Sequence, residues 1–184
     1  EFRRVLFRSW RFYQNAELIF ENARVPHANV VGEPDKGQKV RSGVAAEFSD
    51  FELAANALGI CDAAAEYAMQ FAKKEKRGGK ALYDHQLVQL KIHEMFMLTE
   101  TLRSYVMRAA WDMDNKVHGS LSPVLVMAYA SDVLQRVTRL NLDVHGTRGG
   151  VTDAMAQKLV RDGIIWTHLA GDATQRLKAV RRMK

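Results

Sequence analysis

Apolar residues recur at alternating steps of three and four positions along three long stretches of the chain. These stretches are residues 53–71, 88–113 and 126–144, and helical spacing begins at about Val44. Such spacing places the apolar side chains on one face of an α-helix, and it is typical of helices that pack antiparallel in bundles. The pattern predicts an all-α fold, an up-down antiparallel helical bundle, with a short strand-like segment before it at residues 16–21.

Glycine and proline mark the ends of the predicted helices. Breaks fall at Gly78 and Gly79, at residues 118–123, and at the glycine cluster of residues 146–150. Ser122 precedes a proline, so it is predicted to cap the third helix. Because the connections are short, neighbouring helices are expected to run antiparallel, and shorter helical pieces should follow residue 152.

Some apolar residues lie off these stripes and predict a second apolar face. They are Leu87, Leu90, Phe96 and Leu98 on the second helix, and Leu134 and Leu142 on the third. A single stripe would suffice for a monomeric bundle. The additional face therefore predicts contact with another domain or subunit.

Composition and charge narrow the class of protein. Of the 184 residues, 47% are hydrophobic and 26% charged, which is ordinary for a soluble domain. A single cysteine fits a reducing compartment, and a cytoplasmic protein is expected. The single cysteine, Cys61, excludes an internal disulfide framework and is interpreted as a small core residue. No apolar run approaches the roughly 20 residues that span a bilayer, so no membrane association is expected.

The net charge of +6 invites a nucleic-acid hypothesis, which we consider the weaker one. Three of the arginines lie within residues 1–9, and another basic cluster lies within residues 176–184. Cations at the end of a helix complement the helix dipole, which explains the second cluster without a nucleic acid. No nucleic-acid partner is therefore expected.

Motifs for three common chemistries are missing from the sequence. A di-iron site in a bundle needs Glu-x-x-His on two helices, and none of the six histidines has a glutamate three residues before it. The chain also lacks the Gly-x-Ser-x-Gly elbow of hydrolases, the P-loop and the dinucleotide-binding Gly-x-Gly-x-x-Gly. No metal site is therefore expected.

Two glycine-bearing turns flank the last helical stretch. They are Asp-Val-His-Gly-Thr-Arg-Gly-Gly at residues 143–150 and His-Leu-Ala-Gly-Asp-Ala-Thr-Gln at residues 168–175. Such turns expose N–H groups that can hold a pyrophosphate, although glycines that only end a helix fit the same pattern. The order of His-Gly-x-x-Gly, Leu-Val-Arg-Asp, a glycine turn and a basic final helix resembles the C-terminal domain of the acyl-CoA dehydrogenase family. The resemblance extends over about residues 16–182.

The same resemblance implies a domain organisation. Residues 20–26, with Asn29 and Gly32 after them, are similar to the segment by which the family leaves its middle β domain and enters its helical domain. Residues 10–40 would then be a remnant of that β domain with a linker, and residues 41–184 the helical bundle domain. Residues 1–9 match nothing in the family and are predicted to be a non-native leader, so they are kept apart from the fold.

Residues 74–80 and Gln86 resemble the family's Arg-x-x-Phe-Gly-Lys segment and the glutamine beyond it, which reach the FAD of a neighbouring subunit. The family's arginine falls on Glu75 and its phenylalanine on Gly78. A carboxylate facing a pyrophosphate is repulsive, so Arg77 would have to take over.

In the glycine turn, the family's flavin-contacting glutamine falls on Asp143 and its second glycine on Thr147. The residues implied to contact FAD are Arg77, Gln86, Asp143, Gly146, Thr147 and Gly171. The bends at Gly146 and Gly171 are expected to lie together beside the phosphates of the flavin.

The catalytic base of the family is a carboxylate, and its ungapped position here is Ala170, which cannot take a proton. The Ala-Gly pair resembles a subgroup whose base is a glutamate on the first long helix. Strict counting places Ser49 there, whereas alignment of a preceding Ser-Gly pair places Glu47 there. Glu47 and Asp172 are the candidate bases, and a chain without this proton transfer remains the third possibility.

The function implied is α,β-desaturation of an acyl-CoA thioester by an FAD-dependent acyl-CoA dehydrogenase. The implied partners are an acyl-CoA substrate, an electron-transfer carrier and further copies of the chain in a homodimer or homotetramer. As an incomplete fragment, the chain is expected to be inactive and to bind FAD feebly. The alternative is a non-catalytic helical subunit or scaffold derived from the family, suggested by Glu75, Gly78 and Ala170.

Overall fold

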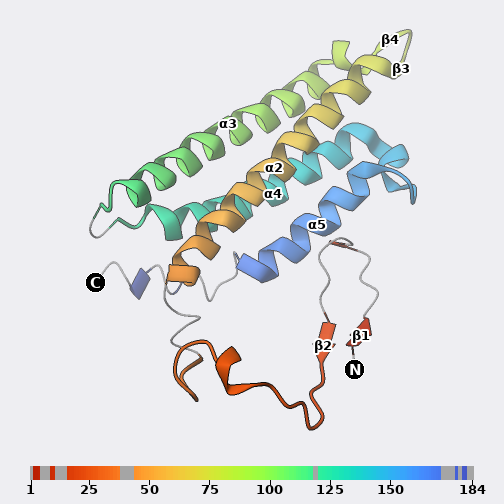
Figure 1. The fold of residues 1–184 in the computed structure, drawn as a ribbon. Helices are drawn as coiled ribbons and strands as arrows, with labels where there is room; N and C mark the ends of the chain where they lie inside the picture. The colour runs from red at the N-terminus through yellow and green to blue at the C-terminus, as the bar shows by residue number, and fades with distance from the viewer. Residues whose placement is uncertain are drawn as a thin grey trace. The chain divides into compact units, whose positions relative to one another are not determined.

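The computed structural model describes residues 2–4, 9–10, 16–37, 44–117, 120–170, 177 and 180–181. The chain divides into two compact units, Glu1–Ser49 and Asp50–Lys184. Figure 1 shows the ribbon, in which long helices dominate. None of the helices in the described part of the chain is both long and apolar enough to cross a membrane.

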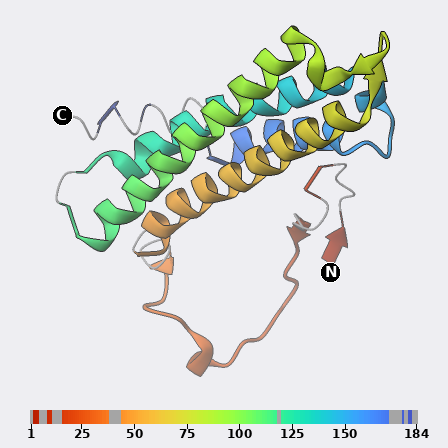
Figure 2. The same cartoon turned by 90° about the horizontal axis from the view of Figure 1, so that it is seen from above.

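The described helices form the predicted bundle (Figures 1 and 2). The four long ones are α2 (Val44–Lys74), α3 (Gln86–Asp114), α4 (Ser122–His145) and α5 (Met155–Ala170). The antiparallel course of α3 and α4 follows from two pairs of residues. Lys91 is ion-paired with Asp143, and the ring of Tyr105 lies 6.0 Å from that of Tyr129. A later residue on α3 is therefore paired with an earlier residue on α4. The predicted all-α bundle is therefore confirmed.

The predicted stripes on α3 and α4 coincide with the core. All six predicted α4 positions are buried, and Ile92, Met95, Leu102 and Val106 are buried on α3. On α2 the buried face is shifted by about one position from the predicted stripe. It consists of small side chains, namely Ala54, Ala57, Cys61, Ala64, Ala65, Ala68 and Ala72. Larger core side chains such as Met127, Leu134 and Trp166 come from the other helices.

The predicted second apolar face is correct only in part. Leu87 and Leu90 of α3 are exposed, at 75% and 64% of their surface. Leu134 is fully buried, and its Cγ atom lies 3.4 Å from where a Cβ atom would stand at Gly163 of α5. The assignment of Leu134 to an outer face was therefore wrong, because α5 covers that side of α4.

The cap of α4 also differs from the prediction. Ser122 is the first residue of the helix, and Leu121 occupies the cap position without a side-chain hydrogen bond. The hydroxyl of Ser120 accepts the N–H of Ser122 at 3.2 Å and donates to the Asp112 carboxylate at 2.7 Å. The serine that accepts the helix N–H is thus two residues earlier, where it also joins α4 to the end of α3.

The first unit contains two short strands. β1 (Phe2–Arg4) pairs antiparallel with β2 (Ala16–Leu18), with Phe2 opposite Leu18. A 3₁₀ helix, η1 (His27–Asn29), follows. The strand expected at residues 16–21 is thus present but shorter. Its partner strand, β1, lies within residues 1–9, which were predicted to be a leader. The assignment of residues 1–9 as a leader remains a prediction.

The Asp112 carboxylate is expected to make the free energy of unfolding depend on pH in the acidic range. Its buried carboxylate accepts hydrogen bonds from the Ser122 and Ser120 hydroxyls and from the Arg108 guanidinium, and these lower its pKa from 3.8 to about 2 against the opposing effect of burial. The unfolded chain takes up this proton near pH 4, whereas the folded chain stays ionised until about pH 2. We therefore expect the free energy of unfolding to fall as the pH is lowered through this window.

The measurement is chemical denaturation at several pH values for the wild type and for Asp112→Asn. The variant should lack the part of the pH slope that belongs to this carboxylate. Asp114→Asn, which changes an exposed carboxylate two residues away, is the matched control and should keep the wild-type slope. Equal slopes in all three proteins would contradict the role of Asp112.

Candidate functional site

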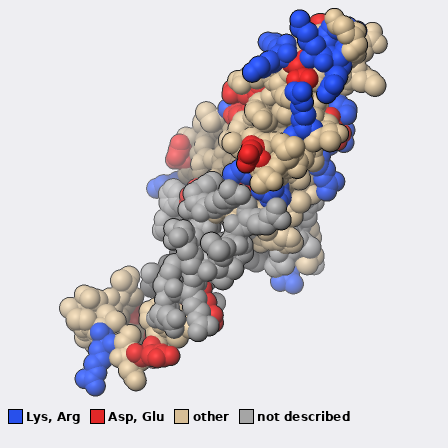
Figure 3. All heavy atoms as spheres, turned by 90° about the vertical axis from the view of Figure 1, so that its right-hand side faces the viewer, with Lys and Arg blue, Asp and Glu red and all other residues tan. Residues whose placement is uncertain are grey.

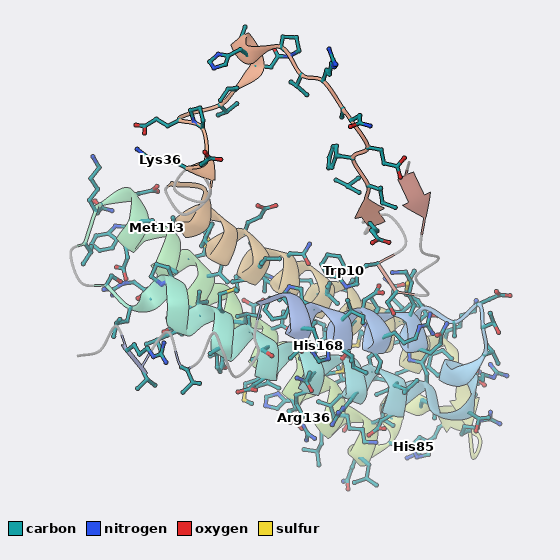
Figure 4. All side chains as sticks on the ribbon, turned by 90° about the horizontal axis from the view of Figure 1, so that it is seen from below. Trp10, Lys36, His85, Met113, Arg136 and His168 are labelled. Carbon is teal, nitrogen blue, oxygen red and sulfur yellow. The ribbon has the colours of Figure 1, made fainter. Side chains whose placement is uncertain are left out.

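One end of the bundle brings together two segments that are far apart in the sequence. The first contains the hairpin of β3 (Lys76–Arg77) and β4 (Lys80–Ala81), with η2 (Leu82–Asp84) after it. The second is η3 (Gly146–Gly150), between α4 and α5. We call this end, residues 75–86 and 143–150, the tip. His85, at the tip, and Met113 mark the two ends of α3 (Figure 4).

The hairpin at the tip needs its two glycines. Gly78 and Gly79 connect the strands and have φ angles of +60° and +82°. Two successive residues in the left-handed region make the tight turn that fits the twist of a hairpin. The Nε2 atom of His85 hydrogen-bonds to the carbonyl of Arg77 at 3.1 Å, and this contact ties the hairpin to the start of α3.

His145 fixes the second segment of the tip to α2. Its buried ring stacks on Tyr67 and Phe71, with ring centroids 4.5 Å and 4.1 Å away. Its Nδ1–H donates to the carbonyl of Asn141 at 2.8 Å. Burial lowers the pKa of His145 below its ordinary value, and the hydrogen bond opposes that effect without cancelling it. The ring is therefore a neutral packing group at the point where α4 ends.

The glycines of η3 have different structural roles. Gly146 adopts a φ of +54°, which turns the chain away from α4. Gly149 is buried, and a Cβ atom there would stand 2.7 Å from the Cδ1 atom of Leu142 and 2.9 Å from the Cβ atom of His145. Nothing lies within 4 Å of the corresponding point at Gly150. Gly149 is thus required for close packing, and Gly146 for the backbone conformation.

Charged groups at the tip are paired across the two segments. Glu75 is ion-paired with Arg148 of η3, and its Oε1 atom lies 3.9 Å from the Nη2 atom of Arg77. Asp143 is ion-paired with Lys91 at 3.3 Å. Figure 3 shows lysine and arginine side chains gathered at the upper end of the molecule, where Figure 1 draws the hairpin. The tip is therefore basic, and its Glu75 and Asp143 carboxylates are each paired with a cation.

The structure brings most of the predicted FAD-contacting residues to the tip. Arg77 and Gln86 come from the hairpin segment and the start of α3, while Asp143, Gly146 and Thr147 come from the end of α4 and from η3. All five are exposed. Arg148 was not among the predicted residues. It stands between two glycines of the motif, but its pairing with Glu75, 73 residues away, has no local signal in the sequence.

The remaining predicted FAD-contacting residue, Gly171, lies outside the described residues. The 16 residues of α5 form a helix of about 24 Å, which begins shortly after η3 and ends at Ala170. The expectation that the bends at Gly146 and Gly171 lie together stays a prediction.

The two candidate bases are described only in part. The backbone of Glu47 lies in the first turn of α2, whereas Asp172 lies outside the described residues. The indole N–H of Trp166 on α5 donates to the carbonyl of Leu53 on α2 at 3.1 Å, so these two helices are in contact there. The assignment of either residue as the base stays a prediction.

A reactive cysteine and a metal site find no support in the described residues. Cys61 is fully buried, and burial together with the neighbouring Asp62 raises the pKa of its thiol to about 12. It is therefore a thiol rather than a thiolate, as expected for a core residue. In the part of the chain that the structure describes, no group of three histidine, cysteine, aspartate or glutamate residues could hold a metal ion.

Comparison with known proteins defines the class to which this bundle belongs. The family model for the C-terminal domain of acyl-CoA dehydrogenases matches residues 45–183. The chain therefore belongs to the acyl-CoA dehydrogenase family and contains its C-terminal domain.

Individual relatives agree with this assignment. The chain is 29% identical to the probable acyl-CoA dehydrogenase YngJ of Bacillus subtilis over 147 residues, which cover 80% of the chain and 38% of the relative. It is 31% identical over 156 residues to the mitochondrial short-chain specific acyl-CoA dehydrogenase of Sus scrofa, with 84% and 38% covered. The chain thus spans well under half the length of these relatives.

A solved structure gives the same result. Butyryl-CoA dehydrogenase from Megasphaera elsdenii superimposes with a TM-score of 0.81 at 27% identity, and the match covers 92% of this chain and 44% of that protein. The predicted fold and the resemblance stated from the sequence are both confirmed.

Gly149 provides a test of the packing at η3. Gly149→Ala should lower the free energy of unfolding by about 1–3 kcal/mol, because the new methyl group meets the Leu142 and His145 side chains. Gly150→Ala, one residue later in open space, should change it by less than about 0.5 kcal/mol. Denaturant titration of both variants measures the difference. Equal effects would mean that η3 does not pack as described.

Proposed function

We propose that this chain is the C-terminal part of a flavin-dependent acyl-CoA dehydrogenase that introduces an α,β double bond into an acyl-CoA thioester. In this reaction a carboxylate takes the α-proton, and FAD, when bound, accepts the β-hydrogen as hydride. The reduced cofactor must then be reoxidised, so an electron-transfer carrier is the expected acceptor. The observation that carries the proposal is the meeting, at the tip, of the two segments that correspond to FAD-contacting segments of the family.

The described residues of the tip suit the diphosphate part of FAD. Arg77 and Arg148 offer exposed guanidinium groups, which bind phosphate oxygens well. Gly146 and Thr147 lie beside them as exposed residues, although the N–H of Gly146 already donates to carbonyls at the end of α4. Glu75 was expected to repel a diphosphate, but its pairing with both arginines reduces this repulsion.

Asp143 and Gln86 complete the proposed cofactor-binding set. Asp143 stands where the family has a glutamine, and its ion pair with Lys91 balances the added charge. Gln86 is exposed in the first turn of α3, at the same end of the bundle. Gly171, which lies outside the described residues, remains in the proposed set on the resemblance alone.

The positions of these groups favour an FAD site that is shared between two subunits. Residues 50–74 alone form about 37 Å of α2, and Glu47 precedes them while the tip follows them. A single small ligand cannot reach both ends of such a helix. We therefore propose that the tip contacts the FAD of a neighbouring subunit, in a homodimer or homotetramer, while Glu47 or Asp172 acts at a second site as the base.

A non-catalytic subunit derived from the family is the alternative function. It is favoured by Ala170, which occupies the ungapped position of the family's catalytic carboxylate and cannot accept a proton. A full-length protein that binds FAD and acyl-CoA but shows no turnover would support this alternative.

The cofactor requirement can be tested on this chain alone. Because the tip supplies only part of the proposed FAD contacts, the purified chain should be colourless and should bind added FAD weakly. Absorbance near 450 nm after gel filtration with excess FAD measures the bound fraction. Stoichiometric yellow protein would contradict the assignment of the remaining contacts to other segments or subunits.

The identity of the base is tested in the full-length context with FAD restored. Glu47→Gln or Asp172→Asn, whichever removes the base, should lower kcat for acyl-CoA oxidation by about 100-fold or more, with FAD still bound. Glu52→Gln, which neutralises an exposed glutamate five residues further along α2, is the control and should retain activity. Turnover that survives both test variants would contradict both assignments.

A further inference from the structure

Exposed cations surround the Glu75 carboxylate. They are Lys76, Arg77, Lys80 and Arg148 at the tip, together with Lys73 and Lys74 at the adjoining end of α2. Glu75 stands among them with only 19% of its side chain exposed, whereas Arg77 and Arg148 are 65% and 60% exposed. The negative charge is therefore the inner group and the guanidinium groups are the outer ones.

Both oxygens of the Glu75 carboxylate face arginines. Oε2 is ion-paired with the Nη1 atom of Arg148, and Oε1 lies 3.9 Å from the Nη2 atom of Arg77. A phosphate group presents the same kind of oxygen acceptors to a guanidinium as a carboxylate does. The carboxylate thus occupies the position on Arg148 that a phosphate ligand would otherwise take.

The backbone holds this arrangement in place. The amide N–H of Glu75 donates to the carbonyl of Phe71 at 2.9 Å, and its carbonyl accepts the N–H of Leu82 at 2.8 Å. Glu75 is therefore fixed between the end of α2 and the far side of the hairpin. Arg148, by contrast, lies on the exposed η3, where its long side chain can move to another anion.

We propose that Glu75 is an internal competitor for phosphate ligands of Arg148, so that it sets the affinity of the tip for a diphosphate. A bound diphosphate must either draw Arg148 away from the Glu75 carboxylate or lie close to that carboxylate. Each of these costs lowers the affinity of the tip for the diphosphate. The inference rests on the proposed function, since the ligand class is the diphosphate of FAD, and it adds a residue that tunes binding at that site.

The probe is inorganic pyrophosphate, titrated into the full chain by isothermal calorimetry at an ionic strength of about 0.1 M. Glu75→Gln keeps the size of the side chain and removes its charge. We expect it to raise the association constant about fivefold to tenfold, as for the loss of one like charge beside a bound anion. Glu75→Ala should give a gain of similar size.

Glu100→Gln is the matched control. It removes the same charge from an exposed position on α3, 14 residues and about 21 Å beyond Gln86, which is more than a Debye length from the tip at 0.1 M salt. We expect it to change the association constant by less than about twofold. A gain from Glu100→Gln equal to that from Glu75→Gln would overturn the proposal, because net charge alone would then explain it.

The double variant tests whether Glu75 acts through Arg148. Arg148→Gln should weaken pyrophosphate binding, and the gain from Glu75→Gln should disappear when Arg148 is already glutamine. A gain that persists in this background, or no gain in the wild-type background, would overturn the proposal. Circular dichroism of each variant confirms that the helices remain folded.

These measurements use pyrophosphate and this chain, so they are separate from the test of the proposed function. If Glu75→Gln shows the expected gain while the full-length protein fails to bind FAD, the proposed cofactor is wrong and the competition at Arg148 stands. If FAD binds in the full-length protein but Glu75→Gln has no effect on pyrophosphate, only the competition is wrong.

Discussion

The stacking of His145 on Tyr67 and Phe71 determines which segments meet at the tip. It holds the last turn of α4 against α2, and Gly146 then turns the chain so that η3 lies beside the hairpin that follows α2. The Glu75–Arg148 ion pair then joins η3 to the residue that follows α2. Burial favours the neutral imidazole, so the ring packs as an aromatic group rather than as a cation. The arrangement of charges at the tip thus depends on an apolar contact in the bundle.

The periodicity of the sequence was sufficient for the helices and for most of the core. It predicted α3 and α4 closely because their buried faces carry large aliphatic side chains, such as Leu102 and Val137. It was less accurate for α2, whose buried face consists of alanines, since alanine gives a weak hydrophobic signal compared with Leu53 or Phe71 on the adjoining side. The cap at Ser120 was missed because it depends on a contact with Asp112, eight residues earlier on another helix.

The sequence suggested which segments form the candidate site, but it did not reveal the ion pairs that join them. The two glycine-bearing segments of the tip were recognised from the motifs that resemble the family. The pairing of Arg148 with Glu75 and of Lys91 with Asp143 joins residues 73 and 52 positions apart, so no local pattern reports it. The expected proximity of Gly146 and Gly171 stays a prediction, because Gly171 lies outside the described residues.

The alanine-lined face of α2 has a consequence for how this domain can vary. Where the contact surface of a helix is made of methyl groups, its neighbours approach closely, and the available volume is already filled by the larger side chains that they contribute. Substitution of Ala64 or Ala68 by valine, although conservative in polarity, would push the neighbouring helices away from α2. Size rather than polarity is therefore what limits change along this helix, and compensation would have to come from smaller partners on the facing helices.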